Sequence, residues 1–171
     1  MSDQDAAAVA LGALAGFGAI LMVLALVVWV LTIIAHWKMF TRAGVEGWKS
    51  IIPIYSDYML FKIVWNTQNF FIYLGIVIVY AILSGLNNAL GPQVTVDAYG
   101  NYVTSGSPNI FLSILSFAAA IAMLVWYVRL QLKTAYAYSK STGFGVGLVL
   151  LNTIFILILG FGDCKYVGPQ E

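Results

Sequence analysis

An unbroken run of thirty uncharged, mostly apolar residues, Ala6–Ala35, constrains this chain more than any other feature. As an α-helix the run would be about 45 Å long, which exceeds the roughly 30 Å hydrocarbon core of a bilayer. Two further stretches are nearly free of charge. Asp97 is the only charged residue between Lys62 and Arg129, and residues 141–162 carry no charge. The chain is therefore predicted to cross a membrane several times.

The composition fits a membrane protein rather than a soluble domain. Charged residues make up 9% of the chain, whereas soluble domains carry about 25%. The net charge of +1 provides no basic field, so no nucleic-acid partner is expected. The single cysteine, Cys164, excludes a disulfide within the chain and a cysteine metal cluster. The acidic MSDQD start lacks the basic region of a signal peptide, so the first apolar run is predicted to stay in the mature protein.

The predicted fold class is an all-α integral membrane protein with one domain, residues 1–171. Four transmembrane helices are expected, at about residues 9–36, 70–90, 110–139 and 144–161. Helix-forming residues continue past the apolar part of the third helix. This helix is therefore predicted to protrude about 15 Å into the cytoplasm.

Between the first two predicted spans lies a segment, residues 37–65, that mixes aromatic and basic residues. Pro53 interrupts its helical pattern, so we predict a broken amphipathic helix that lies at the membrane interface. Tryptophan favours this interface, and the expected anchors are Trp37, Trp48 and Trp65. Residues 51–65 are left with two alternatives, dipping into the membrane or staying at its surface.

Residues 92–109 alternate apolar and polar side chains on both sides of the turn sequence DAYGN. This pattern predicts a short β-hairpin outside the membrane. A lone hairpin is marginally stable, so we expect it to pack on another surface. Tyr99 and Tyr102 are its predicted contact residues, and ordinary interfacial placement is the alternative.

The basic residues predict the orientation. Four lie in residues 36–69 and three in residues 129–140, whereas only Lys165 lies on the other side of the fourth predicted span. Cytoplasmic segments are enriched in Lys and Arg. We therefore expect a protein of the bacterial plasma membrane with both termini and the hairpin outside. The cytoplasmic basic face is predicted to consist of Arg129, Lys133 and Lys140.

Small and polar residues within the spans indicate helix contacts. Gly12 and Gly16 have the spacing of a close helix-packing face, whose partner would be another helix of this chain or another copy. Asn152 lies near the middle of the fourth predicted span, where its amide would form a hydrogen bond across helices. A pore-lining or solute-contacting role is the alternative for Asn152.

Signatures of catalysis are missing from the sequence, so no catalytic residue, metal ligand or cofactor site is predicted. His36 is the only histidine and is expected to serve as an interfacial anchor rather than a base. Ser139, Lys140 and Ser141 suggest a Ser–Lys dyad. However, adjacent helical residues point in different directions, and this segment is predicted to face the cytoplasm.

Two motifs provide a family resemblance. The first, AG..GW..IIPIY, comprises Ala43, Gly44, Gly47, Trp48, Ile51, Ile52, Pro53, Ile54 and Tyr55. The second, KS..F..G followed by FGD.KY.G, comprises Lys140, Ser141, Phe144, Gly147, Phe161, Gly162, Asp163, Lys165, Tyr166 and Gly168. Through these two motifs the chain resembles an uncharacterised family of small bacterial multi-pass membrane proteins, which is defined by a domain of unknown function. Its members are sometimes found ahead of signal peptidase I domains.

The resemblance implies an architecture and no chemistry. The chain departs from the family pattern at Asn152, where a proline is expected, and in the hairpin, which resembles an insertion into a short turn. We expect a non-enzymatic structural or scaffold subunit that associates with copies of itself or with other membrane proteins in the lipid bilayer. One alternative is an oligomeric channel or small-solute permeation unit, in which polar groups would face a common lumen (Asn87, Asn88, Ser116 and Asn152). A third is an accessory subunit of a secretion or processing enzyme.

Overall fold

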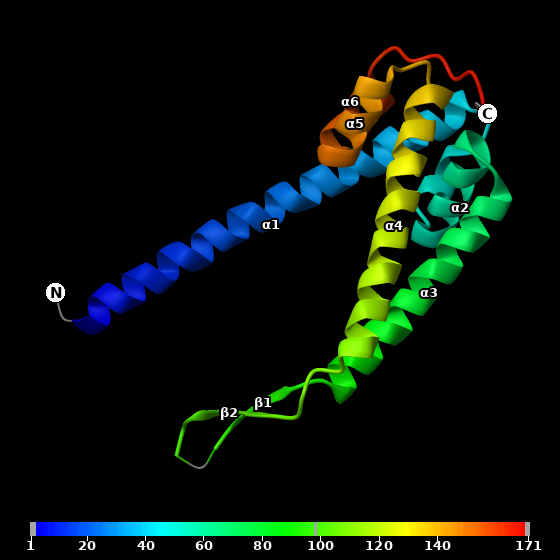
Figure 1. Ribbon diagram of the computed structural model, residues 1–171. Coiled ribbons are helices and arrows are strands. Elements are labelled where there is room, and N and C mark those ends of the chain that lie inside the picture. The colour runs from blue at the N-terminus through cyan, green and yellow to red at the C-terminus, as the bar shows by residue number, and fades with distance from the viewer. Residues whose placement is uncertain (1–2, 98, 170–171) are drawn as a thin grey trace.

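The computed structural model describes residues 3–97 and 99–169, with side chains in the first helix described at Gly12 and from Leu14 onward (Figure 1). It is mostly helical, with one small hairpin. The elements are α1 (Asp3–Arg42), the 3₁₀ turn η1 (Gly47–Ser50), α2 (Pro53–Val64), α3 (Thr67–Leu90), β1 (Gln93–Val96), β2 (Tyr102–Ser105), α4 (Ile110–Ala137), α5 (Thr142–Leu150) and α6 (Asn152–Phe161).

Three of the described helices are long and apolar enough to cross a membrane. They are Leu14–Arg42, Thr67–Leu90 and Ile110–Ala137. This agrees with the prediction of a multi-pass membrane protein. The helix predicted over 110–139 is found at Ile110–Ala137, and that over 9–36 extends to Arg42.

The fourth span predicted over 144–161 is wrong as a single helix. The chain breaks at Leu151, which has φ −128° and ψ 53°. The helices on either side have nine and ten residues, so each is at most about 15 Å long. The rings of Phe144 and Phe155 lie 4.9 Å apart, although one straight helix would separate these residues by about 16 Å. Helices α5 and α6 therefore form a hairpin that turns back on itself.

Glycine allows this hairpin to close. A Cβ atom at Gly147 would overlap the ring of Phe155, so a side chain there would push α6 away from α5. On the other side of α6, Gly160 crosses α1 at Ala35, where a Cβ atom would lie 2.8 Å from the backbone oxygen of Ala35. Gly47 against Trp37 and Gly145 against Leu132 make further close approaches, whereas Gly12 and Gly16 have no atom within 4 Å.

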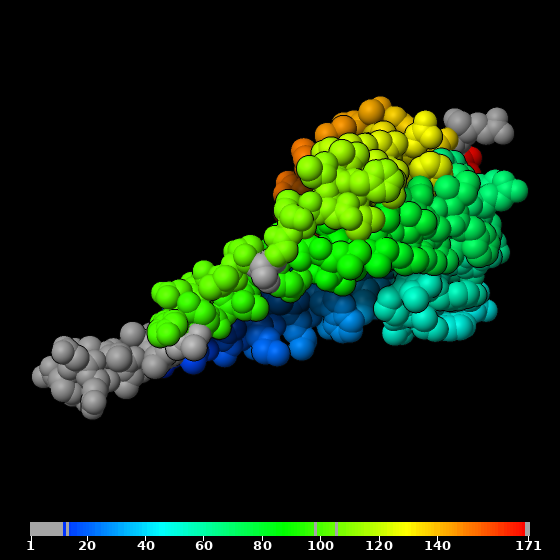
Figure 2. Space-filling view, turned by 60° about the horizontal axis from the view of Figure 1, so that its bottom comes forward, coloured from blue at the N-terminus to red at the C-terminus, as the bar shows by residue number. Residues whose placement is uncertain are grey.

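The buried core lies at one end of the molecule, where the last turns of α1 and α4 meet α2, α5 and α6 (Figure 1). Its fully buried large side chains are Met39, Phe40, Phe61, Val64, Thr134, Tyr138, Leu148, Ile156 and Leu159. From this body, α1 and the antiparallel pair of α3 and α4 extend in diverging directions, and the pair ends at the β-hairpin (Figure 1 and Figure 2). The long apolar parts of these helices are exposed in the isolated chain, as expected for surfaces that face lipid.

The predicted β-hairpin is confirmed. Strands β1 and β2 are antiparallel, with Val94 opposite Thr104. The Asp97 carboxylate accepts hydrogen bonds from the backbone N–H groups of Tyr99 at 2.9 Å and Asn101 at 2.8 Å, which closes the turn. These bonds, that of Asn101 foremost, lower the pKa of Asp97 below its ordinary value. The described strand side chains are exposed, so within the described chain the hairpin does not pack on another surface.

Residues 162–169 do not lie at the end of the molecule that carries the hairpin, where a fourth straight span would place them. Because α5 and α6 turn back, the chain returns to the end of the molecule where α4 finishes (Figure 1). The backbone N–H of Val167 donates to the carbonyl of Ala137 at 2.9 Å. The hydroxyl of Tyr166 donates to the carbonyl of Ile63 at 2.6 Å. The last described residues therefore bind the ends of α2 and α4.

Candidate functional site

A polar cavity of about 240 Å³ lies within the body, between five helices. Its hydrogen-bonding side chains come from α1, α2, α3, α4 and α6, and its remaining lining is apolar. The polar members are His36, Asp57, Tyr73, Tyr127, Gln131 and Asn152, and the apolar members are Leu60, Phe61, Leu130 and Ile156. The cavity has room for several water molecules or one small organic molecule.

His36 is held by its own helix. Its Nδ1 atom lies 2.9 Å from the carbonyl oxygen of Thr32, one turn earlier in α1. Because a carbonyl oxygen only accepts, Nδ1 donates in this contact. In the neutral ring Nε2 is then the acceptor, so it is the ring nitrogen that remains for a molecule in the cavity.

Asp57 brings the only carboxylate among the residues that line the cavity. It is part of α2, the short helix outside the three long apolar helices, and it is exposed at the edge of the cavity. Partial burial raises the pKa of its carboxyl group above the ordinary value. Among the described residues, the one ion pair joins Lys49 and Glu46, so no ion pair neutralises Asp57 there.

Gln131 is the most buried polar residue of the cavity, with 5% of its surface exposed. Among the described residues its Oε1 atom has no hydrogen-bond partner. A buried acceptor without a partner costs about 1 to 3 kcal/mol. The atom has less than 1 Å² of accessible surface, so other atoms of Gln131 line the cavity.

Asn152 occupies a different place from the one predicted. It begins α6 directly after the break at Leu151, and its Nδ2 atom donates to the carbonyl of Leu148 at 3.3 Å. The amide therefore bonds to the end of α5, within its own hairpin, and also lines the cavity. This placement favours the solute-contacting alternative over a hydrogen bond between separate spans.

The other predicted interface residues lie away from the cavity. Gly12 and Gly16 face open space, because no atom lies within 4 Å of a Cβ built at either position. An interface within the described chain is therefore not observed there, and an interface with another chain stays a prediction. Tyr99 and Tyr102 are 90% and 82% exposed on the hairpin.

The three predicted tryptophan anchors differ in their surroundings. Trp37 and Trp48 are exposed, and the indole N–H of Trp48 donates to the carboxylate of Glu46 at 2.8 Å. Trp65 is half-buried, and its ring centroid lies 5.6 Å from that of Trp126. Trp65 is therefore packed within the body.

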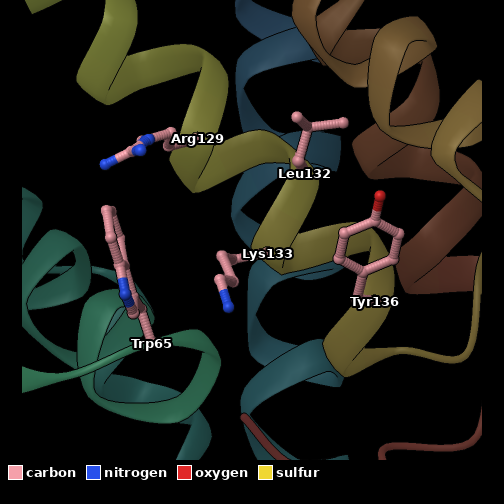
Figure 3. Close-up of a pocket in the computed structure, with 5 residues that line it drawn as sticks. All are labelled: Trp65, Arg129, Leu132, Lys133 and Tyr136. Atoms are coloured by element: carbon pink, nitrogen blue, oxygen red, sulfur yellow. The ribbon is translucent and has the colours of Figure 1, made fainter. Parts of the chain in front are cut away.

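The predicted basic face is divided between two places. Arg129 and Lys133 line a hollow beside Trp65 (Figure 3). Lys140 lies further along the chain, with its amine 5.8 Å from the centroid of the Phe144 ring. Tyr136 borders both the hollow lined by Arg129 and Lys133 and a second one lined by Lys140, and a cytoplasmic basic face stays a prediction.

The polar residues of the predicted lumen are also separated. Asn87 bonds to the hydroxyl of Ser113 at 3.2 Å, which joins α3 to α4 near the hairpin. Asn152 lies at the other end of the molecule, in the body. Within this chain these residues do not line a common path.

Sequence reasoning misses five of the six polar cavity residues. It assigns His36 to the interface as an anchor, and it gives Asp57, Tyr73, Tyr127 and Gln131 no role. A signal is present in α4, where Tyr127 and Gln131 are four residues apart and therefore share one helix face.

Comparisons with family models, with curated proteins and with solved structures give no match. The family resemblance of the two motifs therefore stays a prediction. The chemistry of the site rests on its own residues. No group of three His, Cys, Asp or Glu side chains lies together among the described residues. What the cavity offers is hydrogen-bonding groups, aromatic rings and one carboxylate, a set that suits a small cation carrying N–H groups.

Proposed function

We propose that this protein is a non-enzymatic membrane protein that binds a small organic cation in its polar cavity, from the cytoplasmic side. The observation that carries the proposal is the convergence of six polar side chains from five helices on one cavity in a chain with so few polar residues. Polar groups within a membrane body are costly and therefore favour a functional interpretation.

The distribution of charge supports a cytoplasmic position for the cavity. With three spans, all eight Lys and Arg residues fall on the side that holds the body. With four spans, Lys165 would lie on the opposite side from the other seven basic residues. Because α5 and α6 turn back, Lys165 lies on the same side as the others. By the positive-inside rule this side is the cytoplasm. The N-terminus and the β-hairpin would then be outside, and residues 162–169 inside.

The charge of the ligand follows from the site itself. Asp57 carries the only formal negative charge of the cavity lining, and His36 is neutral or positive. A cation with N–H donors would neutralise the carboxylate and donate to Nε2 of His36, the acceptor nitrogen of the neutral ring. Tyrosine and phenylalanine rings in the lining are suitable surfaces for such a cation.

The proposal is tested by chemical access to the cavity. Asn152→Cys in a Cys164→Ser background places a thiol in the cavity lining. The modification rate is measured in inside-out and right-side-out vesicles with a cationic trimethylammonium-ethyl methanethiosulfonate and its anionic sulfonate analogue. We expect faster reaction with the cation, from the cytoplasmic face, and protection by methylammonium. Ile78→Cys, on the exposed surface of α3, is the control that should not react.

Asp57→Asn provides the matched test of charge. A unit charge at roughly 10 Å in a medium of effective dielectric constant about 20 changes the local cation concentration about tenfold. The substitution should therefore lower the rate with the cationic reagent about tenfold and abolish protection. Equal rates for both reagents in the parent, or no effect of methylammonium, would exclude the proposed cation site.

Self-association is a second candidate function, and the exposure of α1 favours it. Large apolar side chains from Leu14 to Leu31 are exposed around the helix, and Gly16 has open space beside it. We propose that Gly12 and Gly16 pack against a second copy of the chain. Gly16→Leu should shift native mass spectra of the detergent-extracted protein from a multiple of one chain toward a single chain. Gly18→Leu, on a different face of α1, is the matched control and should leave the assembly unchanged.

A further inference from the structure

A second hollow, of about 360 Å³, lies on the outside of the body between α4 and the end of α2. Figure 3 shows Trp65 on one side and four residues of α4 on the other. These four residues are Arg129, Leu132, Lys133 and Tyr136. The hollow shares no lining residue with the polar cavity.

The spacing along α4 brings two cations to this hollow. Arg129 and Lys133 are four residues apart in one helix, so they lie one turn apart on the same face. In Figure 3 the Arg129 side chain extends toward Trp65, and the Lys133 amine lies between Trp65 and Tyr136. The surface of the hollow below these charges is almost entirely apolar.

Trp65, which faces α4 across the hollow, is packed against other aromatic rings. Trp65 stacks on Phe61, with ring centroids 6.4 Å apart, and lies against Trp126 at 5.6 Å. The indole N–H of Trp126 donates to the carbonyl of Asn69 at 3.2 Å. These contacts position the Trp65 ring at the edge of the hollow.

We propose that this hollow binds an anionic phospholipid. Its two cations match the charge of a lipid phosphate, and Arg in particular forms paired hydrogen bonds with phosphate oxygens. Its apolar wall matches the first carbons of an acyl chain. Basic pockets beside membrane helices at the cytoplasmic surface suit such headgroups. The hollow lies at the end of α4 that the distribution of Lys and Arg places at the cytoplasmic surface. Lipid binding in the hollow depends neither on this placement nor on cation binding in the polar cavity.

A simpler interpretation is that both basic side chains extend into the headgroup layer without selecting a lipid. The two interpretations differ in lipid selectivity. If the side chains merely reach the interface, the number of lipids bound per chain would not be fixed. Any preference for anionic lipid would then not depend on Arg129 and Lys133. A site built from Trp65, Arg129 and Lys133 would bind one anionic lipid per chain.

The experiment is native mass spectrometry of the full chain, delipidated in detergent and titrated with phosphatidylglycerol or phosphatidylcholine of matched acyl chains. We expect one tightly bound phosphatidylglycerol per chain, with a Kd at least tenfold below that of phosphatidylcholine. Each basic residue near a membrane surface contributes a roughly five-fold gain in affinity for anionic lipid. Arg129→Gln with Lys133→Gln should therefore weaken phosphatidylglycerol binding about thirty-fold.

The matched control is Lys49→Gln with Lys140→Gln, which removes the same charge from residues outside this hollow. It should retain the preference for phosphatidylglycerol. Arg129→Lys with Lys133→Arg, which keeps both charges, should also retain it, and thermal unfolding will show that each variant is folded. An equal loss in the control pair, no preference in the parent, or displacement of the lipid by millimolar inorganic phosphate would overturn the proposal.

Discussion

Replacing Gln131 by methionine is expected to stabilise the protein and to remove its affinity for a cation. Gln131 is 5% exposed, and Oε1 has no hydrogen-bond partner among the described residues. Methionine has a similar length and no polar atom that requires a partner. The substitution therefore removes the cost of a buried unsatisfied acceptor without creating a large void.

The expected gain is about 1 to 3 kcal/mol in the free energy of unfolding, the usual cost of such an acceptor. In a chain of this size each kcal/mol corresponds to a rise of about 2 to 4 °C in Tm. The assay is thermal unfolding in detergent, followed by tryptophan fluorescence. The same variant, in the Asn152→Cys background, should lose protection by methylammonium.

Thr134→Val is the control for this prediction. Thr134 is fully buried on the same helix, but its hydroxyl is satisfied by the carbonyl of Leu130 at 2.8 Å. Removing a satisfied hydroxyl offers no gain, so the control should leave Tm unchanged or lower it. A lower Tm for Gln131→Met than for the parent would refute the reasoning, because it would mean that Gln131 is a structural hydrogen-bonding residue.

Three further predictions concern single contacts. Partial burial raises the pKa of Asp57, so its ionised form destabilises the folded state. Asp57→Asn should therefore have a higher Tm than the parent at pH 7. This difference in Tm should disappear as the pH falls through the raised pKa. Gly160→Ala should destabilise the protein by about 1 to 3 kcal/mol in thermal unfolding, because its Cβ would overlap the α1 backbone. The control Gly143→Ala lies in open surroundings and should be neutral or stabilising in the same experiment. Tyr138→Phe removes a buried hydrogen bond of 2.9 Å to an α1 carbonyl and should cost about 0.5 to 1.5 kcal/mol in a chemical denaturation experiment.

The parts of the fold that the sequence predicts are those with a local cause. The long apolar runs require length and composition only, so the residues alone are enough to locate three helices. The hairpin also has a local cause, because Asp97 bonds to backbone groups two and four residues further along the chain. Its position follows from the turn sequence alone.

The prediction of a fourth span is wrong because hydropathy does not distinguish one straight helix from two short helices. Residues 144–161 are apolar in either arrangement. The difference arises from the fit of the Phe155 ring against Gly147, and this contact exists only after the chain has turned. The polar cavity escapes prediction for a related reason. Each of its residues, such as His36 at the end of an apolar run, resembles an ordinary boundary residue until five helices bring them together.

The path of the chain has a consequence for biosynthesis. The cavity needs His36 of α1 and also Asn152, which the ribosome adds only after α2, α3 and α4. The core also depends on Tyr166, whose hydroxyl bonds to the end of α2. Until α5 and α6 have been made, the polar groups of α1, α2 and α4 therefore lack their final surroundings. A chain interrupted after α4 would contain all three long apolar helices and still lack a complete cavity.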